Sequence, residues 1–182
     1  DFFDNLEGGL DTMILAAGDC EYVDVKAFDA EAIDRMMQVN TVGLARCVEA
    51  GLTALRRSGK GPHIVGVSSA SALTGLPRAE AYGSSKAAVV SLLESLALDL
   101  HPEGILVSIV LPGFVDTPLT QRNDFPMPFL LDSPEAARRI IAGVEARKAN
   151  IAFPWQLIWS LKLLAALPDR LRIRAGQRMV RN

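Results

Sequence analysis

The sequence predicts an α/β domain built around a parallel sheet, and two observations carry this prediction. Short apolar runs alternate with long helical patterns along the chain, and the runs hold almost no charge, which is typical of strands covered on both faces. The 182 residues are 49% hydrophobic and 22% charged, which fits one domain with a sizeable core.

The elements follow in order from periodicity and from helix-end residues. The expected strands are residues 10–18, 63–69, 105–113 and 151–153, and the expected helices are 29–59, 81–104 and 133–150. Asp29 suits the N-cap of the first helix and Ser133 that of the third, where Pro134 follows in the first turn. The apolar face of the first helix is expected from Ile33, Met36, Met37, Val39, Val42 and Leu44.

Isolated cysteines and histidines argue against a metal site. Cys20 and Cys47 show no CxxC spacing, so we expect reduced thiols in a protein of the cytoplasm. His63 and His101 each lack the neighbours that a metal site needs. The body of the chain has no basic stripe interleaved with aromatic residues, so nucleic acid is not an expected partner.

Small and polar residues end the predicted strands. Ala16, Ala17 and Gly18 close the first strand, Ser68 and Ser69 the second, and Pro112 and Gly113 the third. In parallel α/β sheets, ligands bind at the carboxyl ends of the strands. We therefore expect a ligand site where these turns converge.

The stretch "AYGSSKAAV" places Tyr82 and Lys86 on one face of a predicted helix, since residues four apart are neighbours. An ammonium a few ångströms away typically lowers a phenol pKa by about 1–3 units. Ser69, thirteen residues before Tyr82, can hydrogen-bond a substrate oxygen. The three residues together predict a proton-transfer site, although a Tyr-x-x-x-Lys pair alone also occurs on solvated helix surfaces.

Two longer segments, "GVSSASALTGLPRAEAYGSSKAAV" and "IVLPGFVDTPLT", resemble the short-chain dehydrogenase/reductase family, and the similarity covers residues 10 to about 153. It implies a Rossmann-like, doubly wound parallel sheet. It also implies an NAD(P)-dependent oxidoreductase that interconverts a carbonyl and an alcohol by hydride transfer, with a small-molecule substrate expected to be apolar. The alternative is a non-catalytic scaffold of the same fold that serves binding or assembly.

The resemblance also assigns roles to residues. Tyr82 becomes the acid–base, Lys86 lowers its pKa and holds the nicotinamide ribose, and Ser69 orients the substrate oxygen. Asn40, in "MQVNTVG", matches an asparagine that holds a water in the proton relay, and Thr117 matches a ligand of the nicotinamide carboxamide. The expected cofactor-binding set is Ala17, Gly18, Asn40, Tyr82, Lys86, Pro112, Gly113, Val115 and Thr117.

Two departures from the family pattern matter. Ala16 stands where the family has an asparagine that braces the central strands, a change that we expect to be tolerated. No Gly-rich TGxxxGxG turn for the pyrophosphate occurs, and "SGKGPHIVG" precedes a strand and is predicted to be a loop. Residues 1–153 are therefore expected to be the C-terminal portion of a Rossmann-type domain lacking its first strands, and inactive on their own. NADP and NAD both remain open, with NADP favoured by analogy with reductases of the family.

Residues 118–132 and the tail leave alternatives open. The segment 118–132 matches a lid and forms either an apolar pocket wall or an ordinary packed loop. Arg78 and Glu80, beside the catalytic segment, either contact substrate or belong to the surface.

Residues 154–182 form an amphipathic tail whose part beyond residue 161 has six basic residues against Asp169 alone. This tail predicts either peripheral membrane contact or packing over a partner subunit or the pocket. By resemblance the two long helices build a homodimer or homotetramer.

Overall fold

The computed structural model describes residue 3 and residues 6–179, and it has a four-stranded, fully parallel sheet. The strands stand in chain order: β1 (Thr12–Leu15), β2 (His63–Val67), β3 (Leu106–Pro112) and β4 (Asn150–Phe153). β1 forms one edge, and within the described residues no strand pairs with its outer side. The predicted α/β class is confirmed.

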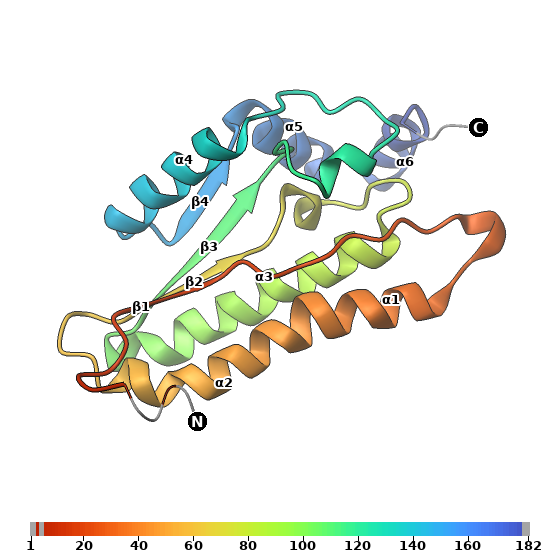
Figure 1. The fold of residues 1–182 in the computed structure, drawn as a ribbon. Helices are drawn as coiled ribbons and strands as arrows, with labels where there is room; N and C mark the ends of the chain where they lie inside the picture. Colours follow the sequence, from red (N-terminus) through yellow and green to blue (C-terminus); the bar gives the residue numbers. More distant parts are fainter. Residues whose placement is uncertain (1–2, 4–5, 180–182) are drawn as a thin grey trace.

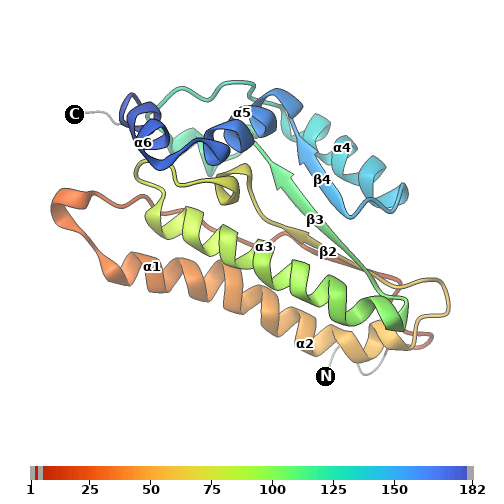
Figure 2. The same cartoon turned by 180° about the vertical axis from the view of Figure 1, so that it is seen from behind.

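The described residues form six α-helices: α1 (Ala30–Met36), α2 (Gly43–Arg56), α3 (Glu80–Leu100), α4 (Ser133–Glu145), α5 (Trp155–Ala166) and α6 (Asp169–Gln177). Helices α2, α3 and α5 pack on one face of the sheet, and α4 packs on the other (Figures 1 and 2). The sheet is thus wound on both sides, as predicted.

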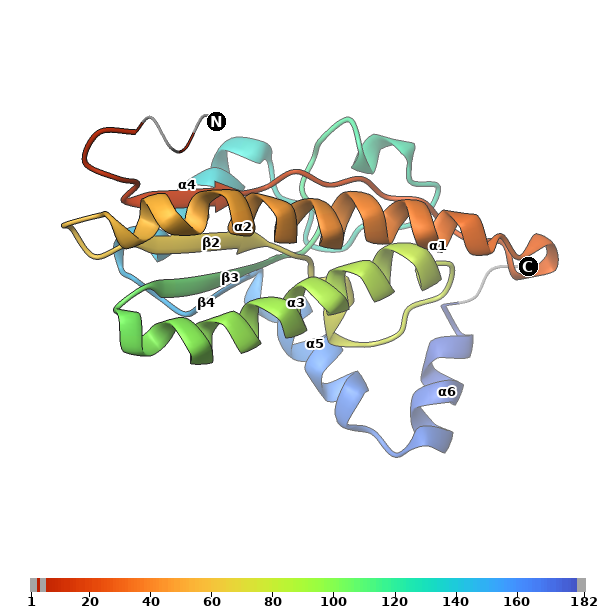
Figure 3. The same ribbon diagram turned by 90° about the horizontal axis from the view of Figure 1, so that it is seen from below.

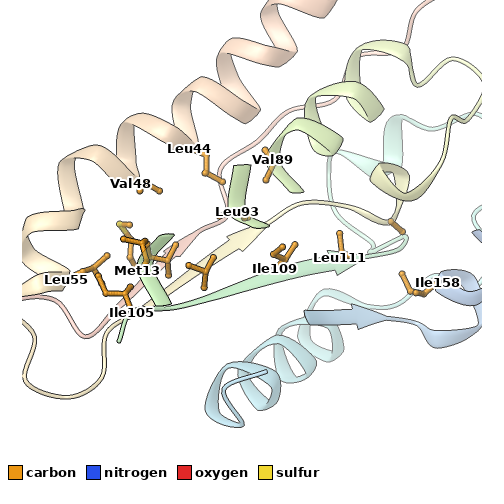
Figure 4. Close-up of a cluster of buried hydrophobic side chains, with 14 of the residues drawn as sticks. Met13, Leu44, Val48, Leu55, Val89, Leu93, Ile105, Ile109, Leu111 and Ile158 are labelled. Carbon is orange, nitrogen blue, oxygen red and sulfur yellow. The ribbon is translucent and has the colours of Figure 1, made fainter. Parts of the chain in front are cut away.

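The two central strands, β2 and β3, are nearly continuous in apolar residues because both of their faces are buried, whereas β1 and β4 each expose one face. Ile64 and Ile109 point into the larger cluster with α2 and α3, whereas their neighbours Val65 and Val110 point toward α4. Figure 4 shows side chains of the larger cluster gathered between the helices and the strands.

Gly66 lets α3 lie close to β2. A Cβ atom at this position would lie 2.3 Å from Cδ1 of Leu93, a fully buried side chain of α3. Only glycine leaves room for this approach without moving the helix. The close contact brings the first turns of α3 to the carboxyl end of β2.

The predicted helix 29–59 exists but is not continuous. Asp29 caps α1 as predicted and accepts the Glu31 N–H at 2.9 Å. A π-helical segment, Met37–Val42, separates α1 from α2, and the Gly43 N–H donates to the Gln38 carbonyl five residues earlier. The wider turn rotates the following residues about the helix axis. The predicted apolar face is therefore wrong at Val39, which is 45% exposed.

Three other expectations concern the start of α4, the stretch before β2 and the tail. Asp132, not Ser133, caps α4, because the Asp132 carboxylate accepts the Glu135 N–H at 2.7 Å. The stretch before β2 is a loop, as predicted. The tail forms two helices, and Figure 3 shows α6 set apart from the sheet and joined to it through α5. Within the described residues, no helix combines the length and apolarity needed to cross a bilayer.

Candidate active site

The residues that follow β1, β2 and β3 meet at the carboxyl end of the sheet, as predicted, and α3 is tied to this end by Lys86. The Lys86 ammonium donates to the Val67 carbonyl at 3.2 Å, and the Ser68 hydroxyl donates to the Lys86 carbonyl at 2.8 Å. Lys86 is only 5% exposed. The side chain and the backbone of one residue thus fix the helix to the strand.

Ser69, Tyr82 and Lys86 lie together. Ser69 caps the short 3₁₀ helix Ala70–Leu73, and its hydroxyl also hydrogen-bonds with the Tyr82 phenol. The Lys86 ammonium lies 5.9 Å from the centroid of the Tyr82 ring. The structure therefore brings together the three residues that the sequence singles out for proton transfer.

The pKa of Tyr82 moves in the direction opposite to the one expected from the sequence. Burial raises the pKa of Tyr82 to about 12, which the hydrogen bond with Ser69 only partly offsets. Burial also lowers the pKa of Lys86 to about 8. Loss of water sets the direction of the Tyr82 shift, and the Lys86 ammonium, which was expected to lower this pKa, is directed at the Val67 carbonyl.

Asn40 sits in the π-helical segment, is 1% exposed, and braces the turn after β1. Its Oδ1 accepts the Asp19 N–H at 2.9 Å, and its Nδ2 donates to the Asp19 carbonyl at 3.0 Å and to the Ser85 hydroxyl at 2.9 Å. Both amide hydrogens are thus engaged by protein groups. The role of Asn40 in holding a water stays a prediction.

The predicted cofactor-binding residues suit the nicotinamide–ribose half of a dinucleotide. The buried Lys86 ammonium has three N–H donors and one protein acceptor among the described residues, which leaves donors for ribose hydroxyls. Gly18 lies against it, since a Cβ atom there would stand 3.0 Å from Lys86 Nζ and 2.9 Å from Asn40 Oδ1. Ala17 and Gly18 are exposed, so the backbone beside the ammonium is open to a ligand.

The remaining predicted cofactor residues follow β3. Pro112 ends the strand, and a Cβ atom on Gly113 would lie 2.6 Å from Leu157 Cδ2, so only glycine fits beside α5. Val115 pairs with Leu131 in an isolated bridge. The Thr117 hydroxyl is 3.2 Å from that of Thr120. These contacts hold the segment after β3 against α5 and against residues 120–131.

A cavity of about 520 Å³ opens beside Ser69 and Tyr82. This volume is typical of small-molecule sites. Its apolar lining comes from Leu76, Phe114, Leu119, Phe125, Leu157 and Leu161. Residues 118–132 therefore supply part of a pocket wall, and α5 supplies another part with its inner face.

Sequence reasoning missed Cys20 and Tyr22, which line the cavity and lie outside the motif segments. Asn123 belongs to the segment 118–132, and Arg178 and Met179 belong to the tail, two segments that the sequence offered as possible cover of the pocket without marking these residues. No pattern marks Cys20 and Tyr22, because they lie outside the regular elements of the sheet. The cavity is assembled only when these segments pack.

The sequence leaves open whether Arg78 and Glu80 contact substrate. Arg78 lines the cavity, and Glu80 does not belong to its lining. The Arg78 guanidinium lies 2.9 Å from an Asp124 carboxylate oxygen and 5.4 Å from the centroid of the Tyr22 ring. Arg78 thus joins the segment before α3 to the segment after β3.

A known family and several known proteins match most of this chain. A family described as short chain dehydrogenase matches residues 2–126. An uncharacterized oxidoreductase of Myxococcus xanthus is 35% identical over 172 residues, which are 94% of this chain and 68% of the relative. A cyclopentanol dehydrogenase of a Comamonas species is 35% identical over 132 residues, 72% of this chain and 50% of the relative.

Among solved structures, a short-chain dehydrogenase from Burkholderia cenocepacia, crystallised in complex with NADP, superposes with a TM-score of 0.77 at 28% identity. The match covers 94% of this chain and 69% of that protein. The chain thus spans between half and about two thirds of the length of these three proteins.

Burial of Lys86 predicts that a neutral side chain at this position stabilises the fold. The pKa is 10.5 for an exposed lysine and about 8 here, so the cost of charging Lys86 is full below pH 8 and disappears above pH 10.5. We expect Lys86→Met to raise the free energy of unfolding by about 2 kcal/mol at pH 7, after the lost hydrogen bond to Val67 is deducted. The gain should fall to about zero at pH 9.5, because the cost of charging Lys86 falls by about 2 kcal/mol between the two pH values.

Urea denaturation at the two pH values measures this gain. Lys60→Met is the matched control, because Lys60 is exposed and its replacement should change neither value. A variant at position 86 that is less stable than the original protein at pH 7 would contradict the prediction.

Proposed function

The chain belongs to the short-chain dehydrogenase/reductase family, and on that premise we propose that it serves as an NAD(P)-dependent oxidoreductase that interconverts a carbonyl and an alcohol. The observation that carries the proposal is the contact between the Ser69 hydroxyl and the Tyr82 phenol at the mouth of an apolar cavity, with the Lys86 ammonium beside them. The site holds an acid, a hydrogen-bond donor and a cation, and the mechanism assigns no covalent step to them.

Each residue has a separate part in the proposed reaction. A bound nicotinamide supplies the hydride acceptor or donor. Ser69 holds the substrate oxygen by a hydrogen bond, and Tyr82 gives that oxygen a proton in reduction or takes one in oxidation. Because the pKa of Tyr82 is about 12 in this structure, the phenol is protonated at neutral pH and ready to act as the acid of a reduction.

We propose that Lys86 and Gly18 contact the nicotinamide ribose and that Thr117 contacts the carboxamide. The exposed backbone at Gly18 and the spare donors of Lys86 support the first assignment. NADP is favoured over NAD, with support from the Burkholderia protein, which was crystallised with NADP. The substrate is proposed to be apolar because the cavity wall is built largely from leucine, phenylalanine and proline side chains.

A scaffold without hydride transfer is the second candidate function, and it makes a different prediction about dinucleotide binding. Titration calorimetry of the complete translation product with NADPH separates the two. Binding supports the oxidoreductase, and its absence supports the scaffold.

The exposed faces of the long helices support a homodimer or homotetramer as the assembled form. Leu98 of α3 is 77% exposed, a strongly exposed apolar side chain on a helix that lies along α1. Burial of this side chain by a second copy would remove its apolar surface from water. We expect Leu98→Lys to shift the particle mass toward the monomer in light scattering, and an unchanged mass would remove this helix from the interface.

The outer face of α5 supports peripheral membrane contact of a cytoplasmic protein through residues 154–182. Trp155, Trp159 and Leu163 are 67%, 65% and 68% exposed and form one stripe along the helix. Lys162 and the arginines of α6 provide positive charge next to this stripe. Aromatic residues flanked by cations are typical of helices that lie on a bilayer surface.

Replacement of the proposed acid tests the reaction. We expect Tyr82→Phe to reduce kcat about 10²–10⁴-fold in NADPH-dependent reduction of a ketone panel, because general acid–base catalysis typically contributes that factor. NADPH affinity should stay within a few-fold, since phenylalanine keeps the ring that Lys86 faces. Full turnover by the variant would refute the role of Tyr82.

Vesicle co-sedimentation tests the membrane contact. The protein should sediment with vesicles that contain phosphatidylserine and should be released by salt, because both apolar and charged contacts contribute. The double change Trp155→Ser and Trp159→Ser should abolish sedimentation. Phe28→Ser is the control, since Phe28 is an exposed aromatic outside the tail. Equal partitioning of all three proteins would remove the membrane contact.

A further inference from the structure

Tyr22 joins the turn after β1 to the segment after β3 and forms part of the cavity wall opposite the tail. Its phenol donates to Asn123 Oδ1 at 2.7 Å, and its ring meets the edge of Phe125 at a centroid distance of 5.6 Å. Arg78 covers the other side of the ring and pairs with Asp124. The Asn123 side chain is therefore oriented by a bond from Tyr22, whose own ring is held by Phe125 and Arg78.

Among the described residues, the amide nitrogen of Asn123 has only a weak hydrogen-bond acceptor. Since its Oδ1 accepts from Tyr22, its amide nitrogen points to a different partner. Among the described residues that partner is Met127 Sδ, at 3.3 Å, and a thioether sulfur is a weak acceptor. Asn123 lines the same cavity as Ser69 and Tyr82.

A carboxamide in this position favours a particular kind of ligand. A ligand that fills the apolar cavity displaces water from the amide nitrogen, and a donor left without an oxygen partner then costs binding free energy. A ligand oxygen within reach removes that cost. In the orientation that the structure gives, Oδ1 accepts the bond from Tyr22, whose raised pKa keeps the phenol protonated throughout the neutral range, so the amide nitrogen is the group left for a ligand oxygen.

We propose that Asn123 is a substrate-binding residue whose amide donates to a second oxygen of the substrate, so that the site selects carbonyl compounds that carry another acceptor. The acceptor is a ketone, ester or hydroxyl oxygen on the apolar skeleton, apart from the oxygen that Ser69 and Tyr82 hold. This inference rests on the proposed function, because the reacting oxygen defines which one is second. Tyr22 acts as a positioning residue for Asn123.

A panel of bicyclic ketones tests the proposal with the complete translation product and NADPH. Decalin-1-one offers one oxygen, and decalin-diones place a second oxygen at different positions on the same skeleton. We expect at least one dione to be reduced with a kcat/KM about tenfold above that of the mono-ketone, after correction for two reacting groups, as one neutral hydrogen bond allows. Equal kcat/KM for all ketones would overturn the proposal.

Variants assign the preference to Asn123. Asn123→Leu, similar in volume, should remove the preference for the dione and raise kcat/KM on decalin-1-one several-fold, because no amide is then left without an oxygen partner. Gln121→Leu makes the same amide-to-leucine change at an exposed residue that does not belong to the cavity lining, and it should keep the preference. Tyr22→Phe should give an intermediate loss, mainly through KM, because the amide becomes free to rotate. A preference that survives in Asn123→Leu would also overturn the proposal.

Binding distinguishes failure of this inference from failure of the proposed function. If no ketone is reduced by any of the proteins, the oxidoreductase proposal fails. Calorimetric titration with the mono-ketone and the diones then still tests Asn123. Tighter binding of a dione that is lost in Asn123→Leu supports the inference, and equal binding of all ketones overturns it.

Discussion

The attachment of α3 to the end of β2 is the constraint on which the site depends. Gly66 allows the helix to approach, and Lys86 then closes the contact with a side-chain bond to Val67 and a backbone bond from Ser68. The ammonium is held almost without water, although burial of a charge opposes folding. A buried, charged residue at this junction trades stability for a cation beside the phenol of Tyr82.

Much of the fold was predictable because its signals are local and agree with one another. Apolar runs such as His63–Val67 carry no competing helical period, and a capping residue such as Asp29 acts within its own turn. The π-helical segment was not predictable in this way, because the residues Met37–Val42 fit an ordinary helix equally well. The hydrogen bonds that accompany it join Asn40 to Asp19 and Ser85, which are far from it in the sequence.

The candidate site also has residues that were predictable from the sequence and residues that were not. Ser69, Tyr82 and Lys86 were predictable because a fixed spacing on a strand end and a helix brings them together. The direction in which the pKa of Tyr82 shifts was not predictable, since it depends on how much water the fold removes. Tyr22 and Asn123 were not predictable, because they are 101 residues apart and meet only through the packing of two loops.

Helix α5 contributes to two surfaces at once. Leu157 and Leu161 face the cavity, while Trp155 and Trp159 lie on the opposite, outward side of the same short helix. A rotation or shift of the helix that suits one surface necessarily displaces the other. During evolution, changes in what the pocket accepts and in what the outside of the molecule touches are therefore expected to arise together rather than independently.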